Sequence, residues 1–503
     1  RECTPEACPY ANGYYARIKG ALWDVLDVPC LTAETLQEYA ERHTVCPFEL
    51  GLDSSLWSDV IIGDYNYLFD PVVHLVRFFE SAGDYIFLVD EAHNLPGRAR
   101  EMHSAALTKT SFYEAKKLLG KGKSSLKNAL TKVNDVFIEW RHRAEEETAA
   151  RDGRFGKTFF LKERSEEFDH LLNRLCEPLE AWLDDHREPD ETHTALLQLY
   201  FDVRAWLRVA DTFDDHFVLQ ITASGSEVRA AQLCLDPSAF LADSFALGRA
   251  AVLFSATLAP ASYYKDLCGV PEARAVALRS PFPAGNQGLF CIGNVSTRYK
   301  DRDASLAIVT ESLATMVRAR CGNYLAFFPS YAYMEQAYAQ FKEHCPEINC
   351  IKQENAMDEQ QKAAFLAQFV PGPSQTLLGF AVMGGVFGEG VDLTGDRLIG
   401  VGIVGPGLPQ VGPRQEQLRD YFEQTRGSGF DYAYRCPGMN KVLQAAGRVI
   451  RTSEDKGVVL LLDDRFARAE YTRLFPRHWH QLQYLRNTTE LEQQLAAFWA
   501  LNQ

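Results

Sequence analysis

The chain has 503 residues, of which 46% are hydrophobic and 24% are charged, and its formal net charge is −15. This composition is enough for about three or four domains and excludes an intrinsically disordered protein. No apolar run reaches the length of about 18 residues that a membrane span needs, so we expect no membrane partner. A nucleic-acid-binding protein is often basic overall, so the acidic net charge counts mildly against that function. It does not exclude it, because a nucleic-acid motor needs only a local basic groove.

The first half of the chain changes character three times. Residues 1–50 contain cysteines in a mostly helical pattern, and two apolar strand-like runs follow at 59–62 and 85–89. Each run ends near a carboxylate or a turn residue, as buried parallel strands do. From residue 96 to about 215, charged and apolar residues alternate at helical spacing, which predicts a helical insertion. Strand-like runs then return at 217–222, 232–235 and 251–254.

The second half alternates strands with helices from about residue 285 to 485. Its strand-like runs lie at 324–328, 376–380, 398–403 and 458–462. This βα alternation is typical of a parallel sheet that helices cover on both faces. The sequence therefore predicts an α/β protein in which a helical insertion interrupts one lobe and a complete second lobe follows.

The segment YIFLVDEAHNL, residues 85–95, carries two carboxylates to the end of an apolar strand, where open α/β sheets bind ligands. In nucleotide hydrolysis one carboxylate holds Mg²⁺ and a second orients or deprotonates the attacking water. Asp90 and Glu91 fit these two roles, and His93 would couple the nucleotide to the second lobe. An acidic turn at the end of a strand is the alternative, and the four letters alone do not decide between the two.

A pair of arginines follows in QAAGRVIRTSEDKGVV. Arg448 and Arg451 are three residues apart, so we expect them to share one helix face, with Gln444 one turn earlier. Two guanidinium groups there could reach the phosphates of ATP across a cleft, as an arginine finger does. A solvated basic helix end would explain the arginines but not the nearby Gly447 or the buried strand that follows.

The glycine-rich segment GGVFGEGVDL, residues 384–393, would let the backbone approach a nucleotide closely. A glycine-rich turn before a strand is common, so this segment alone is a weak signal. Its candidate nucleotide-binding residues are Gly388, Glu389, Gly390 and Asp392.

Two further strand ends carry hydroxyl groups. LFSATL delivers Ser255 and Thr257, whose hydroxyls could bond the carboxylates of the Asp90 segment and relay the nucleotide state. YLAFFPSY presents Ser330 and Tyr331 as candidate contacts to a nucleic-acid backbone. For each segment alone, an ordinary strand-to-helix turn is the favoured alternative.

The cysteines near the start of the chain form a possible ligand set. Cys3 and Cys8 have four residues between them, and Cys46 follows in VCPFEL. Three thiolates could ligate a metal or an iron–sulfur cluster, which usually takes four ligands, and Cys30 could be the fourth. Scattered reduced thiols are the alternative on spacing alone.

The segment GKGKSSLKNAL, residues 120–130, contains Gly-Lys-Ser but is not a phosphate-binding loop. Such a loop needs G-x-x-x-x-G-K-S/T after a buried strand, whereas a polar helical pattern precedes this segment. We interpret it as a basic helical loop in the insertion.

Taken in order, these motifs resemble the iron–sulfur superfamily 2 helicases, the XPD/DinG family, and among them the bacterial DinG-like members. The matching stretches are CTPEACPYANGYY, VCPFELGLDSSLWSDVIIGDYNYLFDP, VDEAHNLPGRAREM, LCLDPSAFL, FSATLAP, LRSPFP, VFGEGVDL and YAYRCPGMNKVLQAAGRVIRTSEDKGVVLLLDDRF. The resemblance implies two RecA-like parallel-sheet lobes, the first interrupted by an iron–sulfur domain and a helical arch. The implied ranges are 1–56 for the iron–sulfur domain, 57–95 and 216–284 for the first lobe, 96–215 for the arch and 285–503 for the second lobe.

The resemblance also implies an activity, which is 5′→3′ movement on single-stranded DNA driven by ATP hydrolysis between the lobes. ATP, Mg²⁺ and a 4Fe-4S cluster are the implied cofactors, and single-stranded or forked DNA is the implied partner. Cys3, Cys8 and Cys46 would be cluster ligands, with a further ligand upstream of Arg1. Tyr67, like Tyr331, would contact the strand. We expect a monomer in the bacterial cytoplasm that serves repair or replication.

The chain departs from the family pattern because the Walker A Gly-Lys-Thr loop and the first DNA-contact motif, which precede the cluster in the family, do not occur in it. The chain opens on Arg1 rather than Met, and we expect an N-terminal truncation that leaves it unable to hydrolyse ATP alone. An RNA-directed DEAH helicase is one alternative, against which the cysteine region and the insertion argue. A truncated module that grips single-stranded DNA without a motor cycle is the other.

Overall fold

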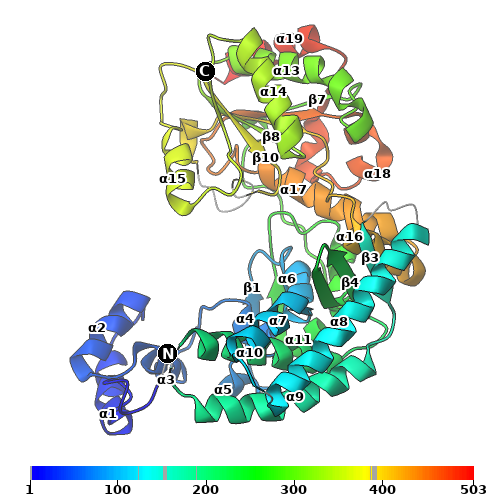
Figure 1. Ribbon diagram of the computed structural model, residues 1–503. Coiled ribbons are helices and arrows are strands. Elements are labelled where there is room, and N and C mark those ends of the chain that lie inside the picture. The colour runs from blue at the N-terminus through cyan, green and yellow to red at the C-terminus, as the bar shows by residue number, and fades with distance from the viewer. Residues whose placement is uncertain are drawn as a thin grey trace. The chain divides into compact units, whose positions relative to one another are not determined.

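The computed structural model describes residues 3–122, 124–150, 156–188, 190–385, 387 and 393–502, and for 148–150 the backbone alone. The chain divides into two compact units, Arg1–Leu68 and Phe69–Gln503, and each is described by itself (Figure 1). Within the described ranges, no helix combines the length and the apolar character needed to cross a membrane.

The first unit contains three helices around a small core. They are α1 (Tyr14–Val25), α2 (Ala33–His43) and α3 (Pro47–Ser55), and the buried core residues include Ile18, Val25, Ala40 and Leu50. This confirms the helical pattern of residues 1–50. The strand expected at 59–62 is wrong: residues 60–64 have no regular structure, and the side chain of Ile62 is 95% exposed. An apolar run alone does not make a strand, because a strand also needs a partner for its backbone groups.

A pair of parallel strands follows in the second unit. β1 (Ile86–Val89) pairs with β6 (Ala250–Leu253), and the bounds of both strands lie within one residue of the predicted runs. The other helices of this part of the chain are α5 (Val76–Phe79), α6 (Leu95–Met102), α11 (Ser238–Ala246) and α12 (Ala261–Leu267), and α4 (Asn66–Phe69) spans the boundary between the two units. One face of the strand pair is bare, because Ile86, Leu88 and Val252 are 64%, 68% and 51% exposed. Parallel sheets usually bury both faces, so this face is unusual.

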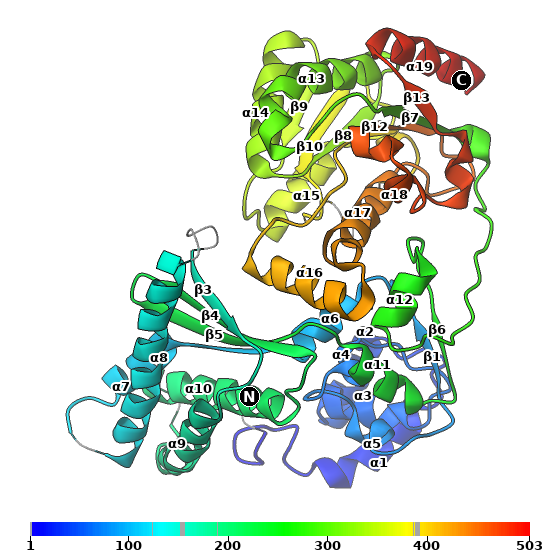
Figure 2. The same cartoon turned by 90° about the vertical axis from the view of Figure 1, so that its right-hand side faces the viewer.

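The insertion is a mixed α/β layer rather than a helical one. Its elements are β2 (Ala105–Thr108), α7 (Lys109–Leu118), α8 (Ser125–Ala150), β3 (Lys157–Leu161), α9 (Glu166–Asp185), α10 (Glu191–Asp211), β4 (Phe217–Ser224) and β5 (Glu227–Cys234). The strands form an antiparallel sheet in the order β2-β5-β4-β3 (Figure 2). Large side chains such as Phe137, Phe159, Phe168 and Trp206 fill the core between this sheet and the helices.

The strands expected at 217–222 and 232–235 therefore do not belong to the parallel sheet of the first lobe. β4 and β5 form a hairpin around Gly225, whose φ of 60° suits the tight turn, and they pair with strands of the insertion. We propose that the insertion runs from Ala105 to Cys234 rather than over 96–215.

The second lobe is built on a seven-stranded parallel sheet in the order β13-β7-β12-β11-β8-β10-β9. The strands are β7 (Gln287–Ile292), β8 (Asn323–Phe328), β9 (Asn349–Lys352), β10 (Leu377–Val382), β11 (Gly400–Val404), β12 (Gly457–Leu462) and β13 (Gln483–Leu485). The helices are α13 (Arg302–Arg318), α14 (Tyr331–His344), α15 (Glu359–Ala367), α16 (Pro413–Arg426), α17 (Cys436–Ala446), α18 (Ala469–Thr472) and α19 (Thr488–Leu501), with a π-helix at Asp431–Arg435.

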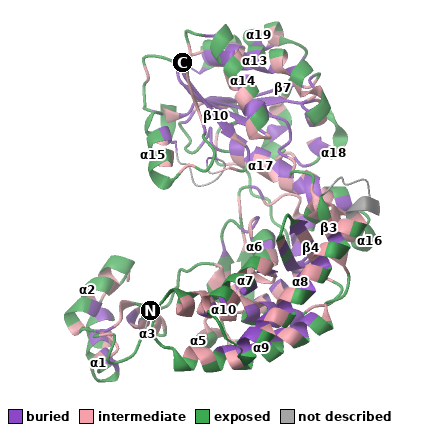
Figure 3. Ribbon diagram, in the orientation of Figure 1, coloured by how far each residue is buried: buried purple, intermediate pink, exposed green. Residues whose placement is uncertain are grey.

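Both faces of this sheet are covered, as the βα alternation predicted. Along β8, Tyr324, Ala326 and Phe328 join the core under α13, α14 and α19, whereas Leu325 and Phe327 join the core on the opposite face. The sheet is accordingly buried throughout its central strands (Figure 3). Its carboxyl edge collects the polar residues that follow the strands.

Candidate active site

The acidic turn of the first lobe begins directly after β1. Asp90 follows Val89, and its Oδ1 accepts a hydrogen bond of 2.7 Å from the backbone N–H of Glu91. Glu91 has a φ of 46°, in the left-handed region that a non-glycine residue rarely adopts. Such strain persists where the surrounding structure over-determines it, and it gathers at functional sites. The turn thus fixes the backbone from which the Glu91 carboxylate projects.

The turn after β6 lies against this acidic turn. The backbone N–H of Ala92 donates to the carbonyl of Phe254, at 3.1 Å. The hydroxyl of Ser255 lies 2.7 Å from Nδ1 of His93 and donates to Oε2 of Glu91 at 3.2 Å. Thr257 lies behind it, with its hydroxyl 3.4 Å from that of Ser255. The structure therefore brings Ser255 to the carboxylate of Glu91, and Thr257 contacts that carboxylate only through Ser255.

A residue of the second lobe completes this chain of hydrogen bonds. Nε2 of Gln444, on α17, lies 2.6 Å from Nε2 of His93, whose side chain is 3% exposed. The Ser255 hydroxyl gives its one hydrogen to Glu91, so Nδ1–H of His93 donates to Ser255. Nε2 of the ring then accepts from the Gln444 amide, whose nitrogen can only donate. One continuous path of hydrogen bonds thus joins the two lobes at the acidic turn.

The two arginines do not share a helix face, which corrects the sequence interpretation. Helix α17 ends at Ala446, and the chain then leaves the helix at Gly447. Arg448 is buried, whereas Arg451 is exposed and its backbone N–H donates to the carboxylate of Asp455 at 2.7 Å. Glycine often follows the last residue of a helix, so Gly447 was a signal in the sequence that the helix ends before Arg448.

Asp455 was not singled out by the sequence, and it organises this turn. The buried carboxylate accepts from the backbone N–H groups of Arg451 and Thr452 and from the Thr452 hydroxyl. The Thr-x-x-Asp spacing of TSED was a usable signal, because short polar side chains bond nearby backbone groups in turns.

The candidate strand contacts of the second lobe lie at the start of α14. Ser330 is the N-cap residue of this helix, and its Oγ accepts a hydrogen bond of 3.1 Å from Arg302. The hydroxyl of Tyr331 accepts from Nε2 of Gln353 at 2.8 Å, and Gln353 is itself buried. The sequence had not marked Arg302 or Gln353. Tyr67 is 38% exposed and belongs to the other compact unit.

The glycine-rich candidates lie outside the described residues. They are Gly388, Glu389, Gly390 and Asp392.

No cysteine of the described residues is joined in a disulfide. Cys3 is exposed, and Cys8 and Cys46 are partly buried. Arg17 connects the segments that carry these two, because its guanidinium donates to the carbonyls of Pro9, at 3.2 Å, and of Thr44, at 2.7 Å.

The donor set nonetheless does not amount to a finished metal site. Among the described residues, no group of three or more His, Cys, Asp and Glu side chains is placed to hold a metal ion. The thiols have the chemistry that a cluster requires, but they are not grouped closely enough to hold one.

Two family models match the chain. One is described as a helicase C-terminal domain and matches residues 313–482, and the other, DEAD_2, matches residues 1–112. The XPD helicase subunit of the general transcription and DNA repair factor IIH of Schizosaccharomyces pombe is 24% identical, over 92% of this chain and 69% of its own length. The ATP-dependent DNA helicase CHL1 of Coccidioides immitis is 22% identical, over 88% of this chain and 59% of its own length.

Solved structures share the fold. The structure titled "Structure of S. tokodaii Xpd4" has a TM-score of 0.57 at 15% identity, covering 92% of this chain and 91% of that chain. The structure titled "XPD_Helicase" has a TM-score of 0.56 at 19% identity, covering 88% of this chain and 76% of that chain.

The family models and the relatives define a superfamily 2 helicase, and the solved structures share its α/β fold with RecA-like lobes. Within that class, the chain is a helicase of the XPD/DinG type. The chain is therefore that of an ATP-dependent DNA helicase.

Proposed function

We propose that the protein couples ATP hydrolysis between its two lobes to 5′→3′ movement along single-stranded DNA. The observation that carries the proposal is the hydrogen bond between His93 and Gln444, at 2.6 Å. It joins the acidic turn after β1 to helix α17 of the second lobe. A motor needs such a contact, because the lobes must register the state of the nucleotide that lies between them.

In this proposal the acidic turn performs the hydrolysis. Asp90 would hold Mg²⁺, which when bound neutralises charge on the phosphates. Glu91 accepts a proton from the attacking water, and the hydrogen bond from Ser255 orients its carboxylate. Arg448 and Arg451 come from the second lobe to the phosphates, where their charge offsets the charge that develops during transfer. Gly388, Glu389, Gly390 and Asp392 are proposed as nucleotide-binding residues.

Coupling follows from the hydrogen-bond path. A movement of Glu91 would shift Ser255 and His93 through their hydrogen bonds, and Gln444 would transmit that shift to α17. Closing the lobes on ATP and reopening them after hydrolysis would move DNA through a groove that includes Ser330 and Tyr331. Tyr67 is proposed as a further strand contact. We place the protein in the cytoplasm as a monomer that acts on single-stranded or forked DNA.

A 4Fe-4S cluster on Cys3, Cys8 and Cys46 is part of the proposal. The support is the link that Arg17 makes between the Cys8 segment and the turn before Cys46. Anaerobically purified full-length protein should contain iron and absorb at about 400 nm, and Cys46→Ser should lose both. Colourless, iron-free wild-type protein would remove the cluster from the proposal.

The decisive experiment on the motor is Glu91→Gln in the full-length protein. This change keeps the shape of the side chain but removes the proton acceptor, so we expect DNA-stimulated ATP hydrolysis to disappear and DNA binding to persist. Glu101→Gln is the matched control, because Glu101 is exposed on α6 and its ion pair with Arg98 is long, at 4.0 Å. Near-normal turnover by Glu91→Gln would refute the role proposed for Glu91.

A strand-gripping module without a motor cycle is the second candidate, and one observation favours it. The 503 residues contain no G-x-x-x-x-G-K-S/T loop to hold ATP phosphates. Measuring ATPase activity with DNA, with RNA and without nucleic acid separates the candidates. DNA-stimulated activity supports the motor, DNA binding without ATPase activity supports the strand-gripping module, and stimulation by RNA alone would favour an RNA-directed helicase.

A further inference from the structure

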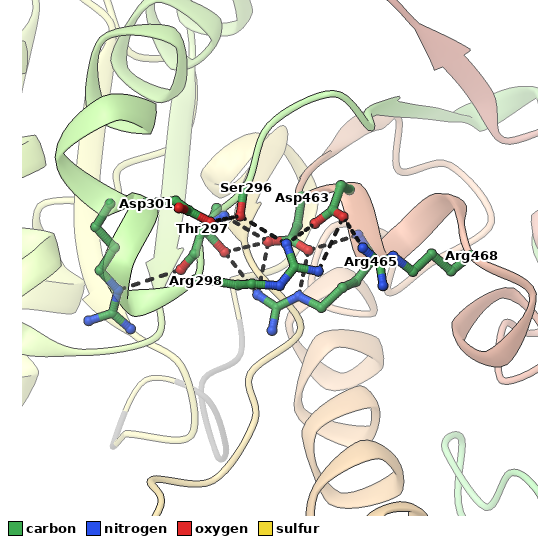
Figure 4. A network of polar contacts seen from close by, with 9 residues as sticks. Ser296, Thr297, Arg298, Asp301, Asp463, Arg465 and Arg468 are labelled. Atoms are coloured by element: carbon green, nitrogen blue, oxygen red, sulfur yellow. Dashed lines mark hydrogen bonds and ion pairs between the residues drawn. The ribbon is translucent and has the colours of Figure 1, made fainter.

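A short segment after β7 is held rigidly at the carboxyl edge of the second-lobe sheet (Figure 4). The backbone N–H and hydroxyl of Thr297 both donate to Oδ2 of Asp463, at 3.1 and 2.5 Å. Arg298 donates through two nitrogens to Asp464, at 2.6 and 3.2 Å. Both aspartates directly follow β12, and Asp463 is fully buried. The segment 296–301 is thus fixed to the neighbouring strand by charge-assisted hydrogen bonds.

Three of the arginines in this network have carboxylate partners. Arg465 pairs with Asp463 at 2.6 Å, and both Arg298 and Arg468 pair with Asp464. Burial opposes ionisation of Asp464, but the hydrogen bonds from Arg298 and Arg468 hold the pKa of its carboxyl below the ordinary value. Each of these guanidinium charges is therefore neutralised within the fold.

Arg302 is different, because no carboxylate of the described residues lies within 4.0 Å of it in an ion pair. Its guanidinium donates to the hydroxyl of Ser330 at 3.1 Å and to the carbonyl of Thr297 at 3.5 Å. It lies between two rings, 5.4 Å from the centre of Tyr299 and 5.3 Å from that of Tyr333. Burial lowers its pKa, which means that its charge is partly desolvated without a counter-charge.

The place of Arg302 in the fold makes this charge more costly. It is the first residue of α13, a helix of 17 residues, and the partial positive charge of a helix N-terminus disfavours a cation. Arg318, at the other end of α13, has the favourable position and also a partner, Glu347, at 2.6 Å. A cation that is unfavourable for stability in two ways indicates a site for an anionic ligand.

Tyr299 supplies the second half of such a site. Its side chain is 86% exposed, although large aromatic rings are usually buried, and one face of the ring lies over Arg302. An exposed ring with a cation against it is the platform on which proteins stack the bases of single strands.

We propose that Arg302 and the Ser330 hydroxyl bind a phosphodiester of single-stranded DNA while Tyr299 stacks on an adjacent base. This inference rests on the proposed function and names a contact that holds the strand on the second lobe. Arg302 would bind the phosphate backbone and Tyr299 would stack on any base, so the contact has no sequence preference. The polar network behind Thr297 and Arg298 fixes the backbone from which both side chains project.

The test measures binding of fluorescein-labelled oligo(dT) to the full-length protein by anisotropy, over a range of salt concentrations. Arg302→Gln should weaken binding about tenfold and lower the dependence on log salt by about 0.7, the effect of one phosphate contact on a single strand. Tyr299→Ala should weaken binding about 5- to 150-fold, and Tyr299→Trp should restore it. Arg318→Gln, the same change at the far end of α13, should bind like the wild type.

An abasic strand separates the two halves of the site. On abasic DNA, Tyr299→Ala should bind like the wild type, whereas Arg302→Gln should still bind less tightly. If wild-type protein binds oligo(dT) but both variants bind equally well, the inference is wrong and the proposed function stands. If wild-type protein binds no DNA, the proposed function itself fails. If Arg302→Gln weakens binding of a fluorescent ATP analogue instead, the anion is a nucleotide phosphate and the DNA assignment is overturned.

Discussion

Replacing Gln444 by alanine tests whether the hydrogen bond to His93 transmits force between the lobes. The His93 side chain is 3% exposed, so loss of the amide removes a hydrogen bond from a buried ring. Removing one partner of a buried hydrogen bond costs about 1–3 kcal/mol, which is about 5- to 150-fold in the equilibrium that joins the lobes. We expect kcat/KM for DNA-stimulated ATP hydrolysis by the full-length protein to fall by that factor.

A double-mutant cycle makes the prediction specific. His93→Ala removes the bonds to Ser255 and to Gln444 together, so the double variant should be no slower than His93→Ala alone, with a coupling of about 1–3 kcal/mol. Gln493→Ala, at an exposed position of α19, should leave the rate unchanged. The reasoning is falsified if the effects of His93→Ala and Gln444→Ala simply add.

Two further predictions concern stability. Asp463→Ala removes the carboxylate that pairs with the guanidinium of Arg465, whose side chain is 14% exposed. It should therefore lower the free energy of unfolding by about 3–5 kcal/mol in urea titrations. Arg318→Ala breaks only the exposed pair with Glu347 and should cost less than about 1 kcal/mol; equal losses for the two changes would contradict this reasoning. Burial lowers the pKa of His103 to about 4, so the unfolded chain binds a proton that the folded chain does not between pH 4 and pH 6.5. Stability should rise with pH across that window, by about 3 kcal/mol at most, and a flat profile in wild-type protein or an equally steep one in His103→Phe would count against this cause.

The second lobe could be read from the sequence because its strands are continuous apolar runs. Val458–Leu462 is buried along its whole length, and no polar residue interrupts the signal. β9 and β13 were missed because they are short strands, of 4 and 3 residues, with exposed positions at the edges of the sheet. β7 was also missed, although its run Leu289–Ile292 is apolar and fully buried and was therefore detectable.

Long-range pairing was beyond the sequence. β2 pairs with β5 in a register that sets Ala105 opposite Gln232, and no local pattern encodes a partner so distant in the chain. The acidic turn was predictable because its residues are adjacent, but its partner Gln444 was placed only by its spacing from Arg448. That spacing failed where the helix ended, and the contact with His93 depends on tertiary packing.

The bare face of the β1–β6 pair has a practical consequence for work with the polypeptide. Exposed isoleucine, leucine and valine side chains on these parallel strands form an apolar surface, and such surfaces drive association and aggregation in solution. We expect residues 1–503 to bind the dye ANS, to elute from a sizing column at a position that depends on concentration, and to need chaperones during expression. The strand pair that carries the acidic turn would thus also govern how the polypeptide is handled at the bench.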